Sequence, residues 1–324
     1  MWRNEASKMD IEVLRTFVEV ADGGGVSAGA LRLGISKSIV SRRLARIEAE
    51  LGVQLLARST RGAALTEAGA TFRYHAARVC AEMDIARETM LPAGDLHGRL
   101  RIAAPLSFGS THLAPVFAEM SRRYPDLHIH TCYSEHLVDI ISEGFDCAIR
   151  LGHLTDSNLI ARRIGPLNRK LVASPEYIEV HGVPETPYEL LTHRALMQGT
   201  ESWQFVDGAK VVKIRPQGQF KADNCTALVA AALAAVGIAY LPEVLLQEHL
   251  ASGALVPVMT NYPIHDSGIF VVRPPGKHHS RKVKVLTEML IERIGKDLHL
   301  TGDEATTEPR RAIRFAPPRA LVNG

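Results

Sequence analysis

Apolar side chains in the first 95 or so residues recur at intervals of three and four positions. Leu14, Phe17, Val18 and Ala21, for example, would share one face of a helix. The same spacing, bounded by small polar residues and glycines, predicts helices over residues 11–21, 28–33, 37–51 and 67–90. This part of the chain is therefore predicted to be almost wholly helical.

Beyond Pro92, Ala93 and Gly94 the pattern changes to short apolar segments that alternate with helical ones. Strands are predicted over residues 100–105, 127–133, 147–151, 159–164, 170–173, 220–222, 238–241, 255–258 and 269–273. Helices are predicted over residues 113–123, 137–142, 226–235, 243–250 and 282–294. Alternation of this kind predicts parallel or mixed sheets covered by helices. Residues 301–324 hold prolines and charges without an apolar period, which predicts a disordered tail.

Composition sets limits on these elements. The chain has 324 residues, 46% hydrophobic and 23% charged, which fits two or three globular domains and excludes a collagen, a disordered chain or a disulfide scaffold. The longest apolar run, residues 227–241, is too short to cross a bilayer, and residues 1–10 lack the apolar core of a secretory signal. We therefore expect a cytoplasmic protein with no membrane partner.

The cysteines and histidines give no metal or cofactor signal. Cys80, Cys132, Cys147 and Cys225 show no CxxC spacing and are expected to be reduced thiols. The fourteen histidines also lack the spacing of metal ligands, so no metal site and no cofactor are expected.

Two of the predicted helices, 28–33 and 37–51, are joined by the tight turn Gly34-Ile35, which is typical of a helix-turn-helix. Ser27 and Ser36 are expected to cap these helices, and Ala30 to occupy their crossing. Apolar anchors are predicted on one face of the second helix at Ile35, Val40, Leu44 and Ile47. The opposite face carries hydroxyls and cations that suit base edges and phosphates: Lys37, Ser38, Ser41, Arg42 and Arg46.

The charge distribution favours DNA as the partner of this segment. The whole chain has a net charge of only +3, whereas residues 32–61 contain seven cations and two anions. This local excess of five positive charges would lie along a DNA backbone, although a solvated basic face explains it equally well. A second basic turn favours DNA binding over a solvated face. Arg58 and Arg61 stand between two apolar segments, a pattern that predicts a β-hairpin wing beside the helix-turn-helix.

The stretch from Met9 to about Ala77 resembles the winged helix-turn-helix of LysR-type transcriptional regulators. The matching segments are MDIEVLRTFVEVADGG, ALRLGISKSIVSRRLARIEAELGVQLLARSTRG and LTEAG. The sequence departs from the family at Val26, where an aromatic residue is usual, at Gly29, where alanine is usual, and at Gly24 or Gly25, where a hydroxyl is usual. These departures predict thinner packing of the first motif helix and leave the recognition helix intact.

The resemblance implies that the helix over residues 67–90 pairs two subunits. Its apolar stripe consists of Phe72, Ala76, Val79, Met83, Ala86 and Met90. Packing on its own domain is the alternative explanation for this stripe.

Residues 98–300 resemble the effector-binding part of the same family, through GRLRIAAPLSFG, LVDIISEGFDCAIRLG, LVASPEYI and FKADNCTALVAAALAAVGIAYLPEVL. The resemblance implies an α+β multidomain chain: an all-α winged helix-turn-helix, a long linker helix, and a C-terminal α/β two-subdomain periplasmic-binding-protein type 2 fold. The expected boundaries are 9–66, 67–92 and 98–300, with subdomain I at 98–167 and 274–300, subdomain II at 168–268 and a tail at 301–324. Crossing strands are expected near 168–171 and 269–273.

In that fold the ligand lies between the subdomains, at strand C-termini and helix N-termini. Ser107 follows the first strand and Asn224 opens a helix, and two helix N-termini facing one cavity favour an anionic effector. Arg150 would pair with that anion, and Phe108 and Trp203 would cover an apolar portion. The remaining candidates are Ser134, Thr226 and Tyr240, and helix capping or ordinary packing is the alternative for each of these residues.

The sequence thus predicts a regulator that binds a dyad-symmetric site in double-stranded DNA as a homodimer, paired into a homotetramer. A small-molecule effector would control it, and an activator would also contact RNA polymerase. The DNA-binding module argues against a solute-binding protein, and the lack of GxSxG, HExxH, P-loop or GxGxxG motifs argues against an enzyme. A thiol-based redox regulator stays open, with Cys132 and Cys147 in neighbouring strand-like segments and Cys225 at a helix N-terminus.

Overall fold

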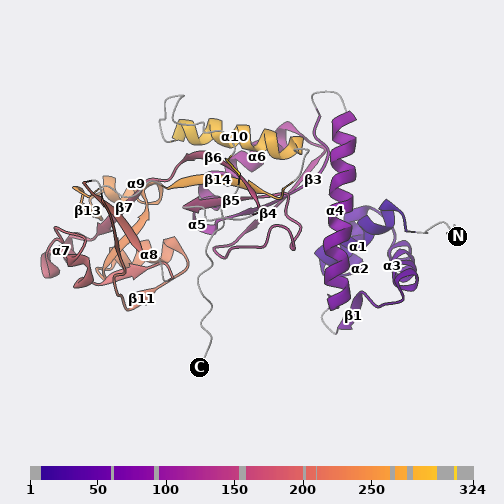
Figure 1. The fold of residues 1–324 in the computed structure, drawn as a ribbon, viewed down its shortest axis with the longest axis horizontal. Coiled ribbons are helices and arrows are strands. Elements are labelled where there is room, and N and C mark those ends of the chain that lie inside the picture. Colours follow the sequence, from indigo (N-terminus) through magenta and orange to yellow (C-terminus); the bar gives the residue numbers. More distant parts are fainter. Residues whose placement is uncertain are drawn as a thin grey trace. The chain divides into compact units, whose positions relative to one another are not determined.

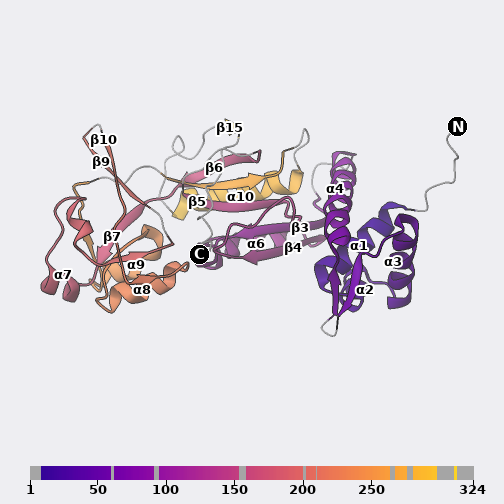
Figure 2. The ribbon, with the colours of Figure 1, turned by 60° about the horizontal axis from the view of Figure 1, so that its bottom comes forward.

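The computed structural model describes residues 9–59, 62–90, 95–152, 158–199, 202–208, 210–262, 267–275, 280–297 and 310–311. The chain divides into two compact units (Figures 1 and 2). The first contains residues 1–98 with two short segments, 141–144 and 278–281, and the second contains the rest.

Helices dominate the first unit, as predicted. Its elements are α1 (Ile11–Gly23), α2 (Val26–Leu33), α3 (Lys37–Leu51), β1 (Leu56–Ser59), β2 (Gly62–Leu65) and α4 (Glu67–Met90). The Ser36 hydroxyl accepts from the Ile39 N–H and caps α3, which confirms that prediction. Gly34 and Gly52 end α2 and α3 with φ of 64° and 69°, in the left-handed region that glycine adopts without strain.

The start of α2 differs from the prediction. The helix begins at Val26 with Gly25 at its N-cap, so Ser27 lies inside the first turn and does not cap the helix. The close approach of α2 to α1 is made by Gly29, where a Cβ would lie 2.5 Å from Cγ2 of Val20. Glycine, in place of the usual alanine, therefore allows α1 and α2 to pack closely at this point.

One apolar core unites the first unit. Its buried members come from all four helices and from the segment before the wing: Val13, Phe17, Val20, Ala30, Val40, Leu44, Ile47, Leu55 and Ala76. The predicted anchors Val40, Leu44 and Ile47 are thus confirmed, and Ile35 packs against the same core in a partly buried position.

The second unit contains a six-stranded and a five-stranded sheet. The six-stranded sheet has the order β15-β6-β14-β5-β3-β4. Its strands are β3 (Gly98–Ala104), β4 (Leu127–Tyr133), β5 (Cys147–Gly152), β6 (Ile160–Pro166), β14 (Gly268–Arg273) and β15 (Arg310–Arg311). β3 runs parallel to β5, and β14 runs antiparallel to both β5 and β6, so the sheet is mixed as predicted. Apart from Arg310 and Arg311, which pair with β6, the predicted tail lies outside the described residues.

Four helical segments of the described chain pack with this sheet. The turn after β3 forms α5 (Leu106–Phe108) and one π-helical turn, η1 (Gly109–Leu113), which continues into α6 (Ala114–Arg123). α10 (Arg281–Asp297) runs along the same sheet (Figure 1), and its Ile294 packs where a Cβ on Gly165 of β6 would stand.

The five-stranded sheet has the order β11-β8-β12-β7-β13. Its strands are β7 (Arg169–Ala173), β8 (Ala195–Met197), β11 (Phe220–Lys221), β12 (Ile238–Pro242) and β13 (Val256–Val258). The surrounding elements are α7 (Pro175–His181), η2 (Glu189–Leu191), the β9–β10 hairpin (Trp203–Asp207 and Lys210–Ile214, Figure 2), α8 (Cys225–Leu233), η3 (Glu243–Leu245) and α9 (Gln247–Ala251). The chain passes between the two sheets twice, from β6 to β7 and from β13 to β14.

Three parts of this unit depart from the prediction. The helix expected over residues 137–142 is instead a turn in which Phe145 N–H donates to the Ile140 carbonyl. The helix expected over 243–250 is divided into η3 and α9. α7, β8 and the β9–β10 hairpin were not predicted, because each is short and carries no long apolar period.

Candidate DNA-binding surface and effector site

The two faces of α3 have opposite character. Val40, Leu44 and Ile47 are buried in the core, whereas every residue predicted to contact DNA from this helix is exposed. The exposed set is Lys37, Ser38, Ser41, Arg42 and Arg46. Ser36 is exposed beside them, with its hydroxyl 2.9 Å from that of Ser38, and Ser27 is exposed on α2. The helix therefore presents cations and hydroxyls on the side that its packing leaves open.

Arg43 is different from its neighbour Arg42. Its guanidinium forms an ion pair with Glu12 and donates to the hydroxyl of Thr16 at 3.0 Å, both on α1. Thr16 is fully buried, so this contact ties α3 to the core of the unit. Arg32 lies 3.9 Å from Glu19, which compensates part of a second charge. Arg43 therefore serves packing within the domain, a distinction that counting charges along the sequence could not make.

The predicted wing is present as an antiparallel hairpin, in which Leu56 pairs with Leu65 and Ser59 with Gly62. Its backbone is attached to α3 by Glu48, whose Oε1 accepts from the N–H groups of Leu55 at 2.8 Å and Leu56 at 3.1 Å. Arg61 and the side chain of Arg58 lie outside the described residues, so their contact with DNA stays a prediction.

The apolar stripe of the long helix α4 is partly buried and partly exposed. Near its start, Phe72 lies 5.2 Å from Phe17, ring centre to ring centre, and Ala76 is buried in the domain core. Further along, Val79, Met83 and Met90 are exposed, by 47%, 40% and 84%. The first half of the stripe therefore packs on its own domain, and the second half is open.

Two ion pairs fasten α4 to α1. Arg15 on α1 binds Asp84 at 2.6 Å, and Arg73 on α4 binds Asp22 at the end of α1. The second pair is largely withdrawn from water, with the side chains 11% and 2% exposed. Removing one partner of such a pair leaves an uncompensated buried charge, so α4 and α1 are held as one body.

In the second unit, the predicted site residue Ser107 connects three segments of chain. Its N–H and its hydroxyl both donate to Oε1 of Glu135, at 2.8 Å and 2.5 Å. Its hydroxyl oxygen also accepts from the N–H of Cys225, the first residue of α8, at 3.2 Å. The ends of β3 and β4 and the start of α8 therefore meet at Ser107.

Most of the other predicted effector residues have contacts within the fold. Asn224 caps α8 by accepting from the Ala227 N–H at 3.1 Å, and Thr226 is exposed on the same turn. The Ser134 N–H donates to the Ala104 carbonyl at the end of β3. Arg150 donates to the Val138 carbonyl at 2.8 Å, so its guanidinium holds the turn that was expected to be a helix.

Trp203 and Tyr240 do not join Ser107, contrary to expectation. Both are buried in an apolar cluster with Leu171, their ring centres 5.7 Å apart. Cys225 belongs to the cluster on the other face of the five-stranded sheet, with Val172. Because adjacent residues of a strand point to opposite faces, Trp203 and Tyr240 are separated from α8 by the sheet itself.

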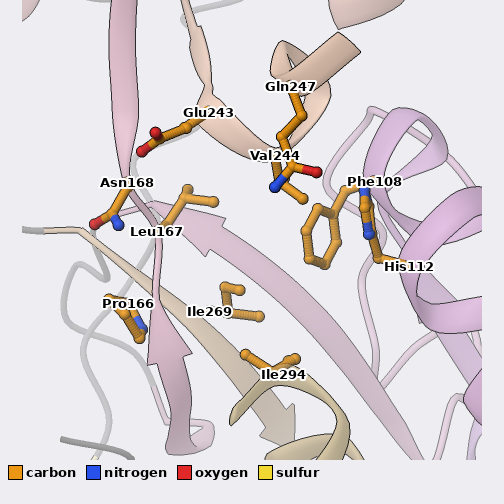
Figure 3. Close-up of a pocket in the computed structure, with 10 residues that line it drawn as sticks. All are labelled: Phe108, His112, Pro166, Leu167, Asn168, Glu243, Val244, Gln247, Ile269 and Ile294. Carbon is orange, nitrogen blue, oxygen red and sulfur yellow. The ribbon is translucent and has the colours of Figure 1, made fainter. Parts of the chain in front are cut away.

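A pocket of about 240 Å³ lies between the two sheets, beside the segment that joins β6 to β7 (Figure 3). Figure 3 shows Phe108 and His112 on one side of it, Pro166 and Leu167 on the other, and Ile294 of α10 below. The lining also includes Asn168, Glu243, Val244, Gln247 and Ile269. Phe108 is the one predicted effector residue among them, and its ring stacks on that of His112 with centres 4.9 Å apart.

The charge of the pocket is low. None of the described residues that line it is Arg or Lys, and its carboxylate, Glu243, forms an ion pair with Lys170 at 2.7 Å. The floor is apolar, and the amides of Asn168 and Gln247 supply polar groups at the side of the second sheet. This chemistry suits an uncharged, largely apolar molecule.

Two of the four cysteines lie in surroundings that disfavour the thiolate. Burial raises the pKa of the Cys80 and Cys147 thiols, which keeps them protonated. Cys132 and Cys147 are not on neighbouring strands, contrary to expectation, because β3 lies between β4 and β5. At roughly 5 Å per strand spacing, their backbones are too far apart for a disulfide without rearrangement.

Within the described parts of the chain, no three His, Cys, Asp or Glu side chains are placed to share a metal ion. The helices described there include none with the length and apolarity needed to cross a membrane.

Comparison with known proteins gives one consistent family. The family model "Bacterial regulatory helix-turn-helix protein, lysR family" matches residues 11–70, and "LysR substrate binding domain" matches residues 93–295. An HTH-type transcriptional regulator of Xanthomonas campestris is 32% identical over 298 residues, 89% of this chain and 86% of that protein.

Solved structures agree with these matches. The virulence activator AphB of Vibrio cholerae, described as a member of the LTTR protein family, is 29% identical with a TM-score of 0.55 over 88% of this chain and 99% of its own. The LysR-type regulator CrgA of Neisseria meningitidis is 31% identical with a TM-score of 0.51 over 89% of this chain and 100% of its own.

Proposed function

Because this chain belongs to the LysR-type family of bacterial transcription regulators, we propose that α3 and the β1–β2 wing read a dyad-symmetric site in double-stranded DNA. In this proposal residues 9–66 bind DNA, residues 67–92 pair two subunits, and residues 98–300 bind a small effector that controls the DNA-bound state. An activator would additionally contact RNA polymerase.

The division of α3 into a buried and a basic face carries the DNA-binding proposal. Arg42 and Arg46 are exposed on the same side as Ser38 and Ser41, while the core holds the other side rigidly. Cations supply phosphate contacts and long side chains reach base edges, so a helix fixed in this way can enter a major groove. The wing, attached to α3 through Glu48, would lie on the adjacent backbone.

The experiment is footprinting of genomic DNA with the purified protein, followed by binding titrations on the recovered site. Arg42→Ala should weaken binding by roughly tenfold or more and reduce its salt dependence, with an unchanged melting temperature. Lys210→Ala removes an exposed cation from the second unit and serves as the matched control. Unchanged binding by Arg42→Ala would contradict the proposed role of this face.

Pairing of subunits through α4 is supported by its open apolar side chains Val79, Met83 and Met90. Three exposed apolar residues on one helix are costly in water and are covered when an identical helix packs against them. A dimer places two recognition helices on two half-sites, and pairing of dimers would give the tetramer.

The effector is proposed to occupy the pocket of Figure 3. An apolar cavity of about 150 Å³ binds benzene, so the 240 Å³ here suits a ring with a short substituent. The lack of Arg and Lys in the described lining disfavours an anion and favours a neutral compound. Benzamide, benzylamine and benzoate are probes of similar size and different charge. The melting temperature of the protein should rise most with benzamide. A larger rise with benzoate, or no rise with any of the three probes, would count against this site.

A further inference from the structure

Glu135 is an anion already seated at the point where the sequence predicts an effector carboxylate. One of its oxygens, Oε1, receives both the N–H and the hydroxyl proton of Ser107. Ser107 is only 9% exposed, so these two donors are turned inward and committed to Glu135. Oε1 therefore makes the pair of contacts that a ligand carboxylate would make with Ser107.

The contact continues into the second sheet. A serine hydroxyl can donate one hydrogen bond and accept another, and here it donates to Glu135 and accepts from the Cys225 N–H. Cys225 is the first residue of α8, whose N-terminal end favours negative charge nearby. Glu135, Ser107 and Cys225 thus form one chain of hydrogen bonds across the boundary between the sheets.

Nothing else in the described structure balances the charge of Glu135. No Lys, Arg or His forms an ion pair with it there, and the adjacent His136 lies 3.6 Å from Asp223 instead. The carboxylate is held by Ser107 and by the field of α8, which are the groups that would hold an incoming anion.

We propose that Glu135 is a built-in ligand that keeps the two sheets of the effector domain in contact through Ser107 and Cys225. An effector bearing a carboxylate would have to displace Glu135, so the wild-type protein disfavours such compounds at this point. The inference rests on the proposed function in placing effector binding between the sheets, and it adds which class of effector is disfavoured at Ser107.

The test uses acetate as a replacement for the missing carboxylate in the full-length chain. Glu135→Ala should lower the melting temperature, and sodium acetate should restore it more than sodium chloride at equal ionic strength. Wild type and Glu248→Ala, which removes an exposed carboxylate elsewhere in the domain, should respond equally to the two salts. Ser107→Ala added to Glu135→Ala should abolish the acetate effect, because the donors are then incomplete.

Hydrogen exchange distinguishes a link across the sheets from a local contact. In Glu135→Ala the amides of both Ser107 and Cys225 should exchange roughly tenfold faster or more, and acetate should slow both. Glu135→Gln keeps an acceptor oxygen and should give intermediate exchange, which preserves the test if the alanine variant folds poorly. Unchanged exchange at Cys225, or equal effects of acetate and chloride on Glu135→Ala, would overturn the proposal.

The same preparations separate this proposal from the regulator function. Titration of the wild type with DNA tests the proposed role of α3 and the wing. Loss of DNA binding in wild type would contradict the proposed function, whereas the acetate and exchange results depend only on the second unit.

Discussion

Gly69 at the start of α4 packs directly against the carbonyl oxygen of Leu55, which precedes the wing. A Cβ at position 69 would lie 2.0 Å from that oxygen, a distance that no side chain tolerates. The same turn is fixed by Thr66, whose hydroxyl donates to the Gln54 carbonyl and accepts from the Gly69 N–H. The glycine in the segment LTEAG is therefore required by a backbone contact between the wing and the linker helix.

Gly69→Ala should accordingly destabilise the first unit by about 1–3 kcal/mol, because backbone has to move. The measurement is denaturant unfolding followed by far-UV circular dichroism. Gly295→Ala is the matched control, since a Cβ there meets nothing within 4 Å and α10 gains helix propensity. Equal effects of the two substitutions would contradict the assigned contact.

Arg43→Ala should lower stability by about 1 kcal/mol through the loss of its bonds to Glu12 and to buried Thr16. Arg42→Ala should leave unfolding unchanged, because the Arg42 side chain is exposed. Unfolding curves of the two variants, recorded together, check this separation of roles. A larger loss of stability for Arg42→Ala would reverse the assignment.

Replacing both Val79 and Met83 by glutamate should prevent the subunit pairing proposed for α4, because each charge would be buried in the helix pair. Sedimentation velocity at several concentrations measures the change, and circular dichroism shows whether α4 keeps its structure. Glu82→Gln alters an exposed neighbour on the same helix and should sediment like the wild type. A double variant with the wild-type sedimentation coefficient would place the subunit contact elsewhere.

Acid should weaken the second unit through His193. Burial and the nearby His181 lower the pKa of His193, whereas Glu189 opposes them. The Tyr177 hydroxyl accepts from the Arg194 N–H and lies 3.2 Å from Nδ1 of His193, to which it can donate its own proton.

The lowered pKa of His193 determines how stability changes with pH. The folded protein binds the His193 proton more weakly than the unfolded chain does, so stability falls as the pH drops through the unfolded pKa of about 6.5. His193→Gln should reduce the loss of melting temperature between about pH 7.5 and pH 5.5. A steeper loss in this variant would contradict the stated sign.

Alkylation should distinguish the four cysteines. Cys80, Cys147 and Cys225 are buried, and burial raises the pKa of Cys80 and Cys147. Iodoacetamide should therefore modify the partly exposed Cys132 roughly tenfold faster than the other three in the folded protein. Peptide mass spectrometry gives the rates. The redox alternative requires in addition that a chain without cysteines fails to respond to oxidant, and a retained response would remove it.

The ends of helices that are set by neighbouring residues could be predicted best from the sequence. Ser36 and Gly34 act on the few residues around them, so their roles at the ends of α3 and α2 follow from residue type alone. Ser27 was assigned wrongly because several residues near it can start a helix, and packing of Gly29 on Val20 favours an earlier start.

Contacts between residues far apart in the sequence could not be predicted. Trp203 and Tyr240 follow strand-like patterns, but the face on which each lies is decided by the register of the whole sheet. The helix expected over 137–142 is replaced by a turn whose Val138 carbonyl accepts from Arg150, twelve positions away. Glu135 was missed for the same reason, because its partner Ser107 lies 28 positions earlier.

The position of β14 between β5 and β6 has a consequence for the order of folding during synthesis. β14 supplies the paired neighbour of both strands, so neither is completed until residue 273 has left the ribosome. The five-stranded sheet already has all its strands at residue 258. The later sheet in the chain can therefore close first, and the cavity between the sheets is the last part of the domain to take shape.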